Sequence, residues 1–373
     1  MKTEISKLVV ITVPITACNL HCHYCCISIS DGWKADAIKI KQSPQFIRKA
    51  LSKERLGGVS LVNITGWGET LLPPTMPEII KELLEEGHYM EVVTNGTLSS
   101  RFDEIAKIPS ELLSHLEFKF SFHYQELMRL GKLDEFFDNV KKMHESGCSF
   151  TLELMPNDEL IPSIESIKEL CIEKVGAFCH LTVGRDDKDG RSLLTSLSRQ
   201  EYETTWGSFG SKMFEYKMDI YNIKRKEFCY AGMWTIYVNL STGDAAQCYG
   251  IKPNQNIYKN LDKPILFRPV GHGCKEPFCY NGHAFLTMGV IPELEAPTYA
   301  DIRNRTTVDG GEWFSPEAKE AFSCKLYDTN HQLTDAEKVL FYLTYPTNYI
   351  RMLNTNKFFI PRIKRKIKRI LKK

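Results

Sequence analysis

Six short apolar segments, rich in β-branched and aromatic residues, recur along the first half of the chain. They are residues 8–13, 59–64, 89–94, 116–122, 149–155 and 177–183. Two of the stretches between them, 77–86 and 160–175, carry apolar residues at helical spacing. Strands that alternate with helices form parallel sheets, because each helix returns the chain to the same end of the sheet. We therefore predict an α/β fold of six βα units, which is an open partial barrel rather than the closed eight-unit form.

The pattern changes near residue 190, and we predict four regions. Residues 1–190 form the partial barrel, and residues 191–228 form a helical connector. Residues 229–292, rich in Gly, Cys and aromatic residues, form a small domain with a β-hairpin and a helix. Residues 293–373 are a C-terminal extension that ends in a basic tail. In a parallel barrel, functional residues lie on the loops after the strands, here after residues 13, 64, 94, 122, 155 and 183.

Composition excludes several classes of protein. The hydrophobic fraction is 43% and the charged fraction is 25%, which are globular values and argue against a disordered chain or a coiled coil. No apolar run is long enough to span a membrane. Twelve cysteines in 373 residues are too few for a disulfide scaffold and favour metal sites in the cytoplasm. Residues 8–18 also resemble a lipoprotein signal, but Glu4 and Pro14 argue against that interpretation.

Three cysteines, Cys18, Cys22 and Cys25, stand within eight residues on the loop after the first predicted strand. Thiolates are soft ligands that suit zinc, Cu(I) or iron–sulfur clusters. Structural zinc takes four protein ligands, whereas three cysteines suit a [4Fe–4S] cluster with one iron left open. A zinc site remains an alternative because of three neighbouring residues, which are His21, His23 and Cys26.

The spacing Cys-x3-Cys-x2-Cys, with an aromatic residue before the third cysteine, resembles that of the radical S-adenosylmethionine (SAM) superfamily. The resemblance implies a [4Fe–4S] cluster whose open iron binds SAM. It also implies reductive cleavage of SAM to a 5′-deoxyadenosyl radical, which abstracts a hydrogen atom from a substrate. An electron donor of the flavodoxin or ferredoxin type would supply the electron.

Two further motifs follow predicted strands, as the resemblance requires. Residues 66–69, Gly-Trp-Gly-Glu, resemble the family's Gly-Gly-Glu turn, although Thr70 replaces the usual proline. Asn95 lies in a Thr-Asn-Gly turn after the third strand. Taken alone, such turns are also typical of ordinary connections. The SAM-binding residues that the resemblance implies are Tyr24, Gly66, Gly68, Glu69, Asn95 and Ser121.

A second group of cysteines resembles the twitch domain, the shorter relative of the SPASM domain. Residues 234–240 and 245–248 predict a β-hairpin with Gly243 in its turn. The resemblance implies one auxiliary [4Fe–4S] cluster, although the downstream Cys-x4-Cys spacing is longer than is usual. Its ligands would be Cys229, Cys248, Cys274 and Cys279. Structural zinc on the same four thiolates is the alternative, and Cys324 is a further candidate ligand or hydrogen-atom donor.

The resemblance predicts the type of reaction better than it predicts the substrate. Only seven residues precede the first strand, so we expect no leader-binding domain and a small, possibly sugar-like substrate that is oxidised, epimerised or dehydrated. Modification of a ribosomally made precursor peptide is the alternative. A distant alternative is a zinc protein that binds nucleic acid, without enzymatic activity. We expect no nucleic acid as a partner. The sequence does not identify the catalytic base, and the candidates are His123, Glu153, Arg185 and His272.

The tail carries an unbalanced charge. Residues 357–373 contain nine Lys and Arg and no acid, which leaves 39 basic and 46 acidic residues elsewhere. Isoleucine and leucine recur at helical spacing in residues 360–373. This pattern is typical of an amphipathic helix that lies on an anionic membrane surface. A solvated terminus or a helix docked on the acidic body fits the pattern equally well.

Overall fold

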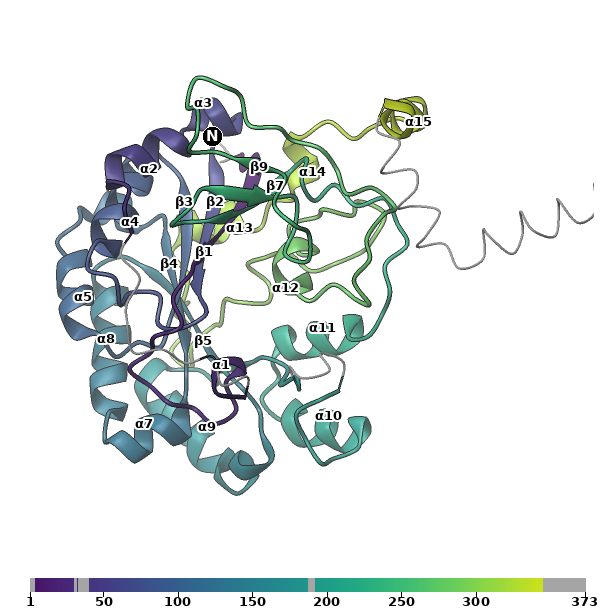
Figure 1. Ribbon diagram of the computed structural model, residues 1–373. Helices are drawn as coiled ribbons and strands as arrows, with labels where there is room; N and C mark the ends of the chain where they lie inside the picture. The colour runs from purple at the N-terminus through teal and green to yellow at the C-terminus, as the bar shows by residue number, and fades with distance from the viewer. Residues whose placement is uncertain (1–3, 30–31, 33–39, 187–191, 345–373) are drawn as a thin grey trace, which may run out of the picture.

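A single mixed sheet runs through the centre of the protein (Figure 1). The computed structural model describes residues 4–29, 32, 40–186 and 192–344. The sheet has nine strands in the order β6-β5-β4-β3-β2-β1-β7-β8-β9. The strands are β1 Lys7–Val13, β2 Ser60–Gly66, β3 Tyr89–Thr94, β4 Leu116–Ser121, β5 Ser149–Leu154, β6 His180–Leu181, β7 Thr235–Asn239, β8 Asp244–Ala246 and β9 Gln255–Asn256. Strands β1 to β6 pair in parallel, which confirms the predicted α/β fold with a six-stranded partial barrel.

Helices cover both sides of this sheet. In Figure 1, α4, α5 and α8 lie along one side, and α11 and α12 lie on the other. The helices are α1 Cys26–Ile29, α2 Pro44–Ala50, α3 Lys53–Leu56, α4 Met76–Glu85, α5 Ser99–Ile105, α6 Ser110–Leu113, α7 Tyr124–Leu130, α8 Leu133–Glu145, η1 Asp158–Ser163, α9 Ile164–Val175, α10 Arg199–Gly207, α11 Lys212–Ile220, α12 Gly282–Phe285, α13 Pro316–Phe322, α14 Leu326–Thr329 and α15 Asp335–Thr344. The predicted helix over 160–175 starts as a 3-10 turn that contains Pro162.

Two elements differ from the prediction. The sixth strand is only two residues long, since the Arg305 guanidinium, and not a neighbouring strand, donates to the carbonyl of Cys179. The predicted hairpin is present as β7 and β8, with Gly243 at a φ of 73° in its turn. However, β7 also pairs in parallel with β1, so the hairpin extends the barrel sheet. The sequence did not indicate this attachment.

The strands of the barrel alternate between an outer apolar face and an inner polar face. On β4, Phe118 and Phe120 contact Phe102 of α5. Successive side chains of a strand point to opposite faces. Lys119, between the two phenylalanines, and Glu117 and Ser121 on either side of them therefore belong to the inner face. Charged residues therefore line the interior of the barrel.

The C-terminal extension fills part of that interior. Arg303 is fully buried, and its Nε donates to Oε2 of Glu91 at 2.7 Å. The hydroxyl of Tyr299 donates to the same oxygen at 2.7 Å. Thr151 of β5 donates to Glu117 at 2.6 Å. These contacts bring residues 299–303 against the inner face of β3, β4 and β5.

The buried carboxyl of Glu117 predicts a pH dependence of stability. Burial, together with neighbouring Glu91, raises its pKa from 4.5 to about 8. The folded protein therefore holds this proton more tightly than the unfolded chain does. The stabilisation that comes from the protonated Glu117 carboxyl is complete below about pH 4.5, and it is lost as the pH rises through about 8. Glu117→Gln should flatten the fall of the unfolding temperature between about pH 6 and about pH 8, measured by calorimetry.

The exposed Glu111 of α6 supplies the matched control. Glu111→Gln should leave the pH profile of the wild type unchanged. A profile of Glu117→Gln that superimposes on that of the wild type would show that Glu117 is ionised in the folded state throughout this range.

The basic tail, residues 360–373, lies outside the described residues. Within the part of the chain that the structure describes, none of the helices combines the length and the apolar run needed to cross a bilayer.

Candidate active site

One cavity at the carboxyl ends of β1 to β4 brings together motifs that are more than 100 residues apart in the sequence. Its lining includes residues from the cysteine loop, the Gly-rich turn, the Asn95 turn and the end of β4. The predicted site residues that line it are Cys18, Cys22, Cys25, Gly66, Gly68, Glu69, Asn95 and Ser121. We refer to it as the cysteine cavity. Tyr24 is not among its lining residues.

The three thiols of the cysteine cavity fit an iron–sulfur cluster. Burial raises the pKa of Cys18 to about 11 and that of Cys22 to about 12, so both are neutral thiols in the absence of metal. Thiolate ligation is then coupled to loss of the protons when iron binds. Within the described residues, no group of three or more His, Cys, Asp or Glu side chains is drawn together around a single metal ion. The residues present fit a [4Fe–4S] cluster by their donor atoms and by their common cavity.

The Gly-rich turn is fixed to the cysteine loop by backbone contacts. The amide of Gly68 donates to the carbonyl of Ile15 at 2.6 Å, and the amide of Glu69 donates to the carbonyl of Ala17 at 3.0 Å. A Cβ atom on Gly68 would lie 2.0 Å from the Ala17 carbonyl oxygen. Glycine at this position is therefore required by close packing against the chain itself.

Glu69 holds two motifs together from the floor of the cavity. Its side chain is buried, and its Oε1 accepts from the hydroxyl of Thr94 at 2.7 Å and from the amide of Leu71 at 2.9 Å. Its Oε2 accepts from the amide of Asn95 at 2.8 Å. Burial raises the pKa of Glu69, although these three hydrogen bonds oppose that effect. All three donors are neutral, so a cationic group bound in the cavity would stabilise the carboxylate.

Asn95 links the third strand to the cysteine loop. Its Nδ2 donates to Oδ1 of Asn19 at 2.8 Å and lies 3.6 Å from Sγ of Cys18. Its Oδ1 accepts from the hydroxyl of Thr97 at 2.8 Å. The turn needs Gly96, which has a φ of 75°. Asn95 thus both shapes its own turn and positions the first cysteine.

Tyr24 is buried beside the cavity. Its hydroxyl lies 3.0 Å from Nδ1 of His123, and His123 itself lines the cysteine cavity. Burial lowers the pKa of His123 to about 4, so the ring is neutral at physiological pH. In this structure the Tyr24 hydroxyl contacts His123, and the binding of SAM by Tyr24 remains a prediction.

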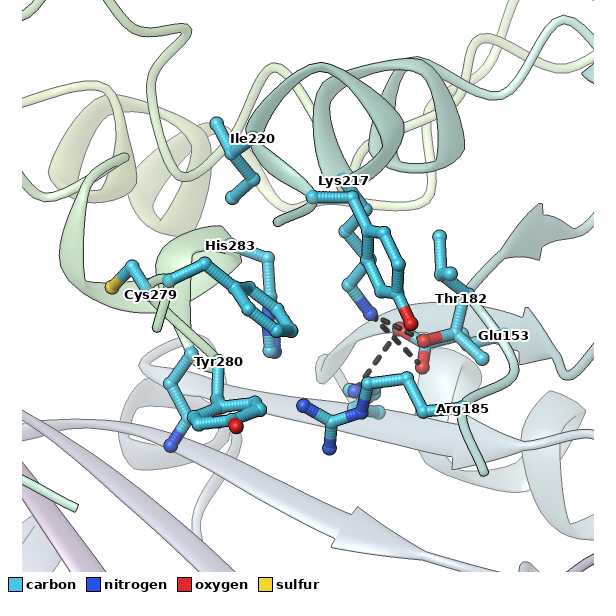
Figure 2. A pocket seen from close by; sticks show the side chains of 13 residues that line it. Glu153, Thr182, Arg185, Lys217, Ile220, Cys279, Tyr280 and His283 are labelled. Atoms are coloured by element: carbon cyan, nitrogen blue, oxygen red, sulfur yellow. Dashed lines mark hydrogen bonds and ion pairs between the residues drawn. The ribbon is translucent and has the colours of Figure 1, made fainter. Parts of the chain in front are cut away.

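A second cavity opens between the strand ends and the C-terminal half of the chain. Glu153, Thr182 and Arg185 lie on one side of it, and Cys279, Tyr280 and His283 lie on the opposite side (Figure 2). We refer to it as the charged pocket; its volume is about 160 Å³. Cys279 is one of the predicted auxiliary ligands, so this pocket borders the second cysteine group.

The charged pocket holds a buried network of one acid and two lysines. Nζ of Lys119 lies 3.0 Å from Oε2 of Glu153, and Nζ of Lys217 lies 3.7 Å from Oε1. Burial opposes the ionisation of Glu153, but the two lysines together lower its pKa to about 2. The network joins β4 and β5 to α11, because Lys217 belongs to that helix.

The two cavities are neighbours on the inner face of the barrel. Ser121 lines the cysteine cavity, and Glu153 lines the charged pocket. These two residues are register partners on the adjacent strands β4 and β5. Side chains at paired positions of adjacent strands share one face of the sheet. A substrate in the charged pocket would therefore lie beside a cofactor in the cysteine cavity.

The cysteines of the second group lie near enough to influence one another's ionisation. Burial is the main reason that the pKa of Cys279 is raised, and the neighbouring thiols of Cys248, Cys229 and Cys274 raise it further. Burial and then Cys274 raise the pKa of Cys248 to about 12. Four thiols that influence one another in this way fit a common metal centre, and their protons would again leave on ligation.

The candidate bases fall in different places. Glu153 and Arg185 line the charged pocket, and His123 lines the cysteine cavity. His272 contacts Tyr342 at 2.9 Å and lines neither cavity. Glu153 is a weak base at a pKa of about 2, and the guanidinium of Arg185 offers hydrogen-bond donors but no acceptor atom. Cys324 also lies outside both cavities, where its Sγ donates to the carbonyl of Glu320.

Sequence reasoning missed several residues of the charged pocket, which are Lys119, Lys217, Tyr280 and His283. A signal for Lys119 exists, because Glu117, Lys119 and Ser121 alternate with apolar residues in a strand that reads as buried. That period of two indicates a polar inner face. Lys217 lies three or four residues from Met213, Phe214, Ile220 and Tyr221, a spacing that places it on the apolar face of a helix.

Comparison with known proteins agrees with the geometry of the cysteine cavity. Residues 12–170 match the sequence model of the radical SAM superfamily, and a search of curated proteins found no match. Among solved structures, Streptococcus suis SuiB aligns at 18% identity over 69% of this chain and 66% of SuiB, with a TM-score of 0.46. This chain thus spans just under two thirds of SuiB. The AdoMet-bound anSMEcpe aligns at 16% identity over 96% of this chain and 98% of its own, also with a TM-score of 0.46.

The match over residues 12–170 contains the cysteine loop, the Gly-rich turn, the Asn95 turn and the end of β4. These are the segments that line the cysteine cavity. Over residues 12–170 this chain is therefore similar to the radical SAM superfamily.

Proposed function

We propose that the protein is a radical SAM enzyme that transforms a small molecule held in the charged pocket. The observation that carries the proposal is the adjacency of the two cavities. The cysteine cavity contains three thiols, Glu69 and Asn95, and the charged pocket beside it contains the polar groups that a substrate needs. Hydrogen abstraction requires the substrate carbon to lie close to the cleaved cofactor, and adjacency supplies that proximity.

Each group has a role that its contacts support. Cys18, Cys22 and Cys25 would hold the SAM-binding [4Fe–4S] cluster, which with SAM supplies a hydrogen-abstracting radical. Glu69 would bind the SAM ammonium through the free lone pair of Oε2, and Asn95 keeps Cys18 in place. The four C-terminal cysteines would hold one auxiliary [4Fe–4S] cluster at the border of the charged pocket.

The auxiliary cluster would favour oxidation among the reactions of a small molecule. Loss of a hydrogen atom and then of a proton leaves one electron on the substrate. Cys279, which lines the charged pocket, would place an electron acceptor beside that position. Epimerisation and dehydration need no such acceptor. A flavodoxin or ferredoxin would supply the electron for SAM cleavage.

The experiment that tests this function is anaerobic reconstitution with iron and sulfide. The reconstituted protein should be brown, bind about eight irons as two cubanes, and release 5′-deoxyadenosine slowly from SAM when dithionite is added. Stoichiometric zinc, or no 5′-deoxyadenosine from iron-loaded protein, would contradict the proposal.

Replacement of Glu69 should weaken SAM binding. Glu69→Ala removes a charge-assisted hydrogen bond to the ammonium, which should cost ~1.5–3 kcal/mol of SAM binding free energy. Glu69→Gln removes the charge and keeps one accepting oxygen, so at least one of the hydrogen bonds from Thr94, Leu71 and Asn95 is lost. Equilibrium binding of SAM to iron-loaded protein provides the measurement. Equal SAM affinity in Glu69→Gln and the wild type would show that the charge of Glu69 does not bind the ammonium.

A further inference from the structure

The charged pocket contains more positive than negative charge. Lys119, Arg185 and Lys217 line it, and Glu153 is the acidic residue of its lining. The side chains of Lys119, Glu153 and Lys217 are each about nine-tenths buried. Among the described residues, no acidic side chain lies within ion-pair distance of Arg185. The two buried lysines therefore share one carboxylate, that of Glu153. The excess positive charge is costly, because the buried groups have lost their hydration.

Neighbouring groups do not remove this excess. The deeper acid Glu91 is paired with Arg303 at 2.7 Å. Glu117 beside it has a pKa raised to about 8 by burial and by Glu91, so it is largely protonated at neutral pH. Burial, with the nearby cations Lys119, Arg303 and Arg185, lowers the pKa of Lys217 to about 7. His283 is surrounded by the same cations, and its pKa lies well below its ordinary value, first because of burial.

The walls of the pocket leave room for an anion between the cations. The guanidinium of Arg185 lies over the ring of Tyr280 at 5.0 Å, whereas the Lys217 ammonium is held beside Glu153 and Thr182. Figure 2 shows the Lys217 ammonium and the Arg185 guanidinium directed into the same space. Thr182 fixes the Lys217 ammonium by accepting a hydrogen bond from it. This arrangement is preorganised, because both cations have fixed partners.

We propose that Lys119, Arg185 and Lys217 bind a phosphate group of the substrate. When Lys217 carries its proton, the three basic side chains exceed the single carboxylate of Glu153 by two positive charges. A phosphate monoester at neutral pH carries a charge of about −1.5 to −2, whereas a carboxylate carries one charge. The phosphate therefore matches the surplus better. This inference deepens the proposed function and rests on the charged pocket being the substrate site of that enzyme.

The auxiliary cluster is the other anion that these cations could balance. The contacts of the cations argue against this, because Lys119 and Lys217 pair with Glu153, Lys217 also donates to Thr182, and Arg185 lies over the ring of Tyr280. The test nevertheless uses cluster-loaded protein, so that any charge of the cluster is already present.

The test is isothermal titration of cluster-loaded protein with inorganic phosphate and, separately, with acetate at constant ionic strength. The wild type should bind phosphate at least about tenfold more tightly than acetate, because phosphate makes more charge-assisted hydrogen bonds. Lys217→Met should weaken phosphate binding at least about tenfold. Lys217→Arg keeps the charge and should retain most of the affinity. Lys212→Met, on the exposed face of the same helix, is the matched control and should bind as the wild type does.

The outcomes separate this inference from the proposed function. Protein that cleaves SAM but binds phosphate no better than acetate would overturn the phosphate site and leave the enzyme class intact. Protein that binds phosphate but never cleaves SAM would overturn the proposed radical SAM function and leave the phosphate site intact. Equal loss of phosphate binding in Lys217→Met and Lys212→Met would assign the binding to general surface charge and would also reject the site.

Discussion

Replacing Cys18, Cys22 and Cys25 together by alanine should abolish the cleavage of SAM and remove about half of the bound iron. The three thiols line the cysteine cavity, and in the proposed function they hold the SAM-binding cluster. Without the cluster no electron reaches the sulfonium of SAM, so the effect on 5′-deoxyadenosine formation is complete rather than partial. Iron and sulfide analysis, together with chromatography of the nucleoside product, provide the measurements.

A core cysteine provides the matched control. Cys148 is buried just before β5 and lines neither cavity. Cys148→Ala should keep the full iron content and the full rate of SAM cleavage. Cys22→Ala alone should show the same loss as the triple variant. Agreement between the two would show that the loss does not come from misfolding of the triple variant. An iron content that the triple replacement leaves unchanged would refute the assignment of the first cluster.

Replacing Cys229 or Cys248 should have the complementary effect. Either change removes one ligand of the converging second group, so the auxiliary cluster and about four irons should be lost. The cysteine cavity is built from other segments, so slow cleavage of SAM in the absence of substrate should continue. Turnover of the substrate should fail, because the charged pocket borders Cys279 and loses its electron acceptor.

Metal analysis of the same variants distinguishes the alternatives. Loss of one zinc and no iron in Cys229→Ala would assign the second group to structural zinc. Retention of about eight irons in both variants would contradict an auxiliary cluster on these cysteines. A combined Cys18→Ala and Cys229→Ala protein should bind almost no iron, since the two sites are independent.

Local sequence determined the barrel strands and the first site. The strand over 89–94 has the predicted bounds, and the other five lie within the predicted segments to a few residues, because buried parallel strands are short apolar runs that need no partner to be recognised. The residues of the cysteine cavity could be predicted for the same reason. Each follows a strand of a parallel sheet, and the carboxyl ends of such strands meet at one edge.

Only the tertiary structure decided how the second half of the chain completes the molecule. β7 pairs with β1 across more than 200 residues of sequence, and Arg303 enters the barrel to meet Glu91. Neither contact has a local signature, since a strand edge or a buried charge is satisfied by whichever partner the fold brings near. Lys217 illustrates the same limit. On α11 it is one lysine on an otherwise apolar helix face, and only the packing of the helix brings it to Glu153 and Thr182.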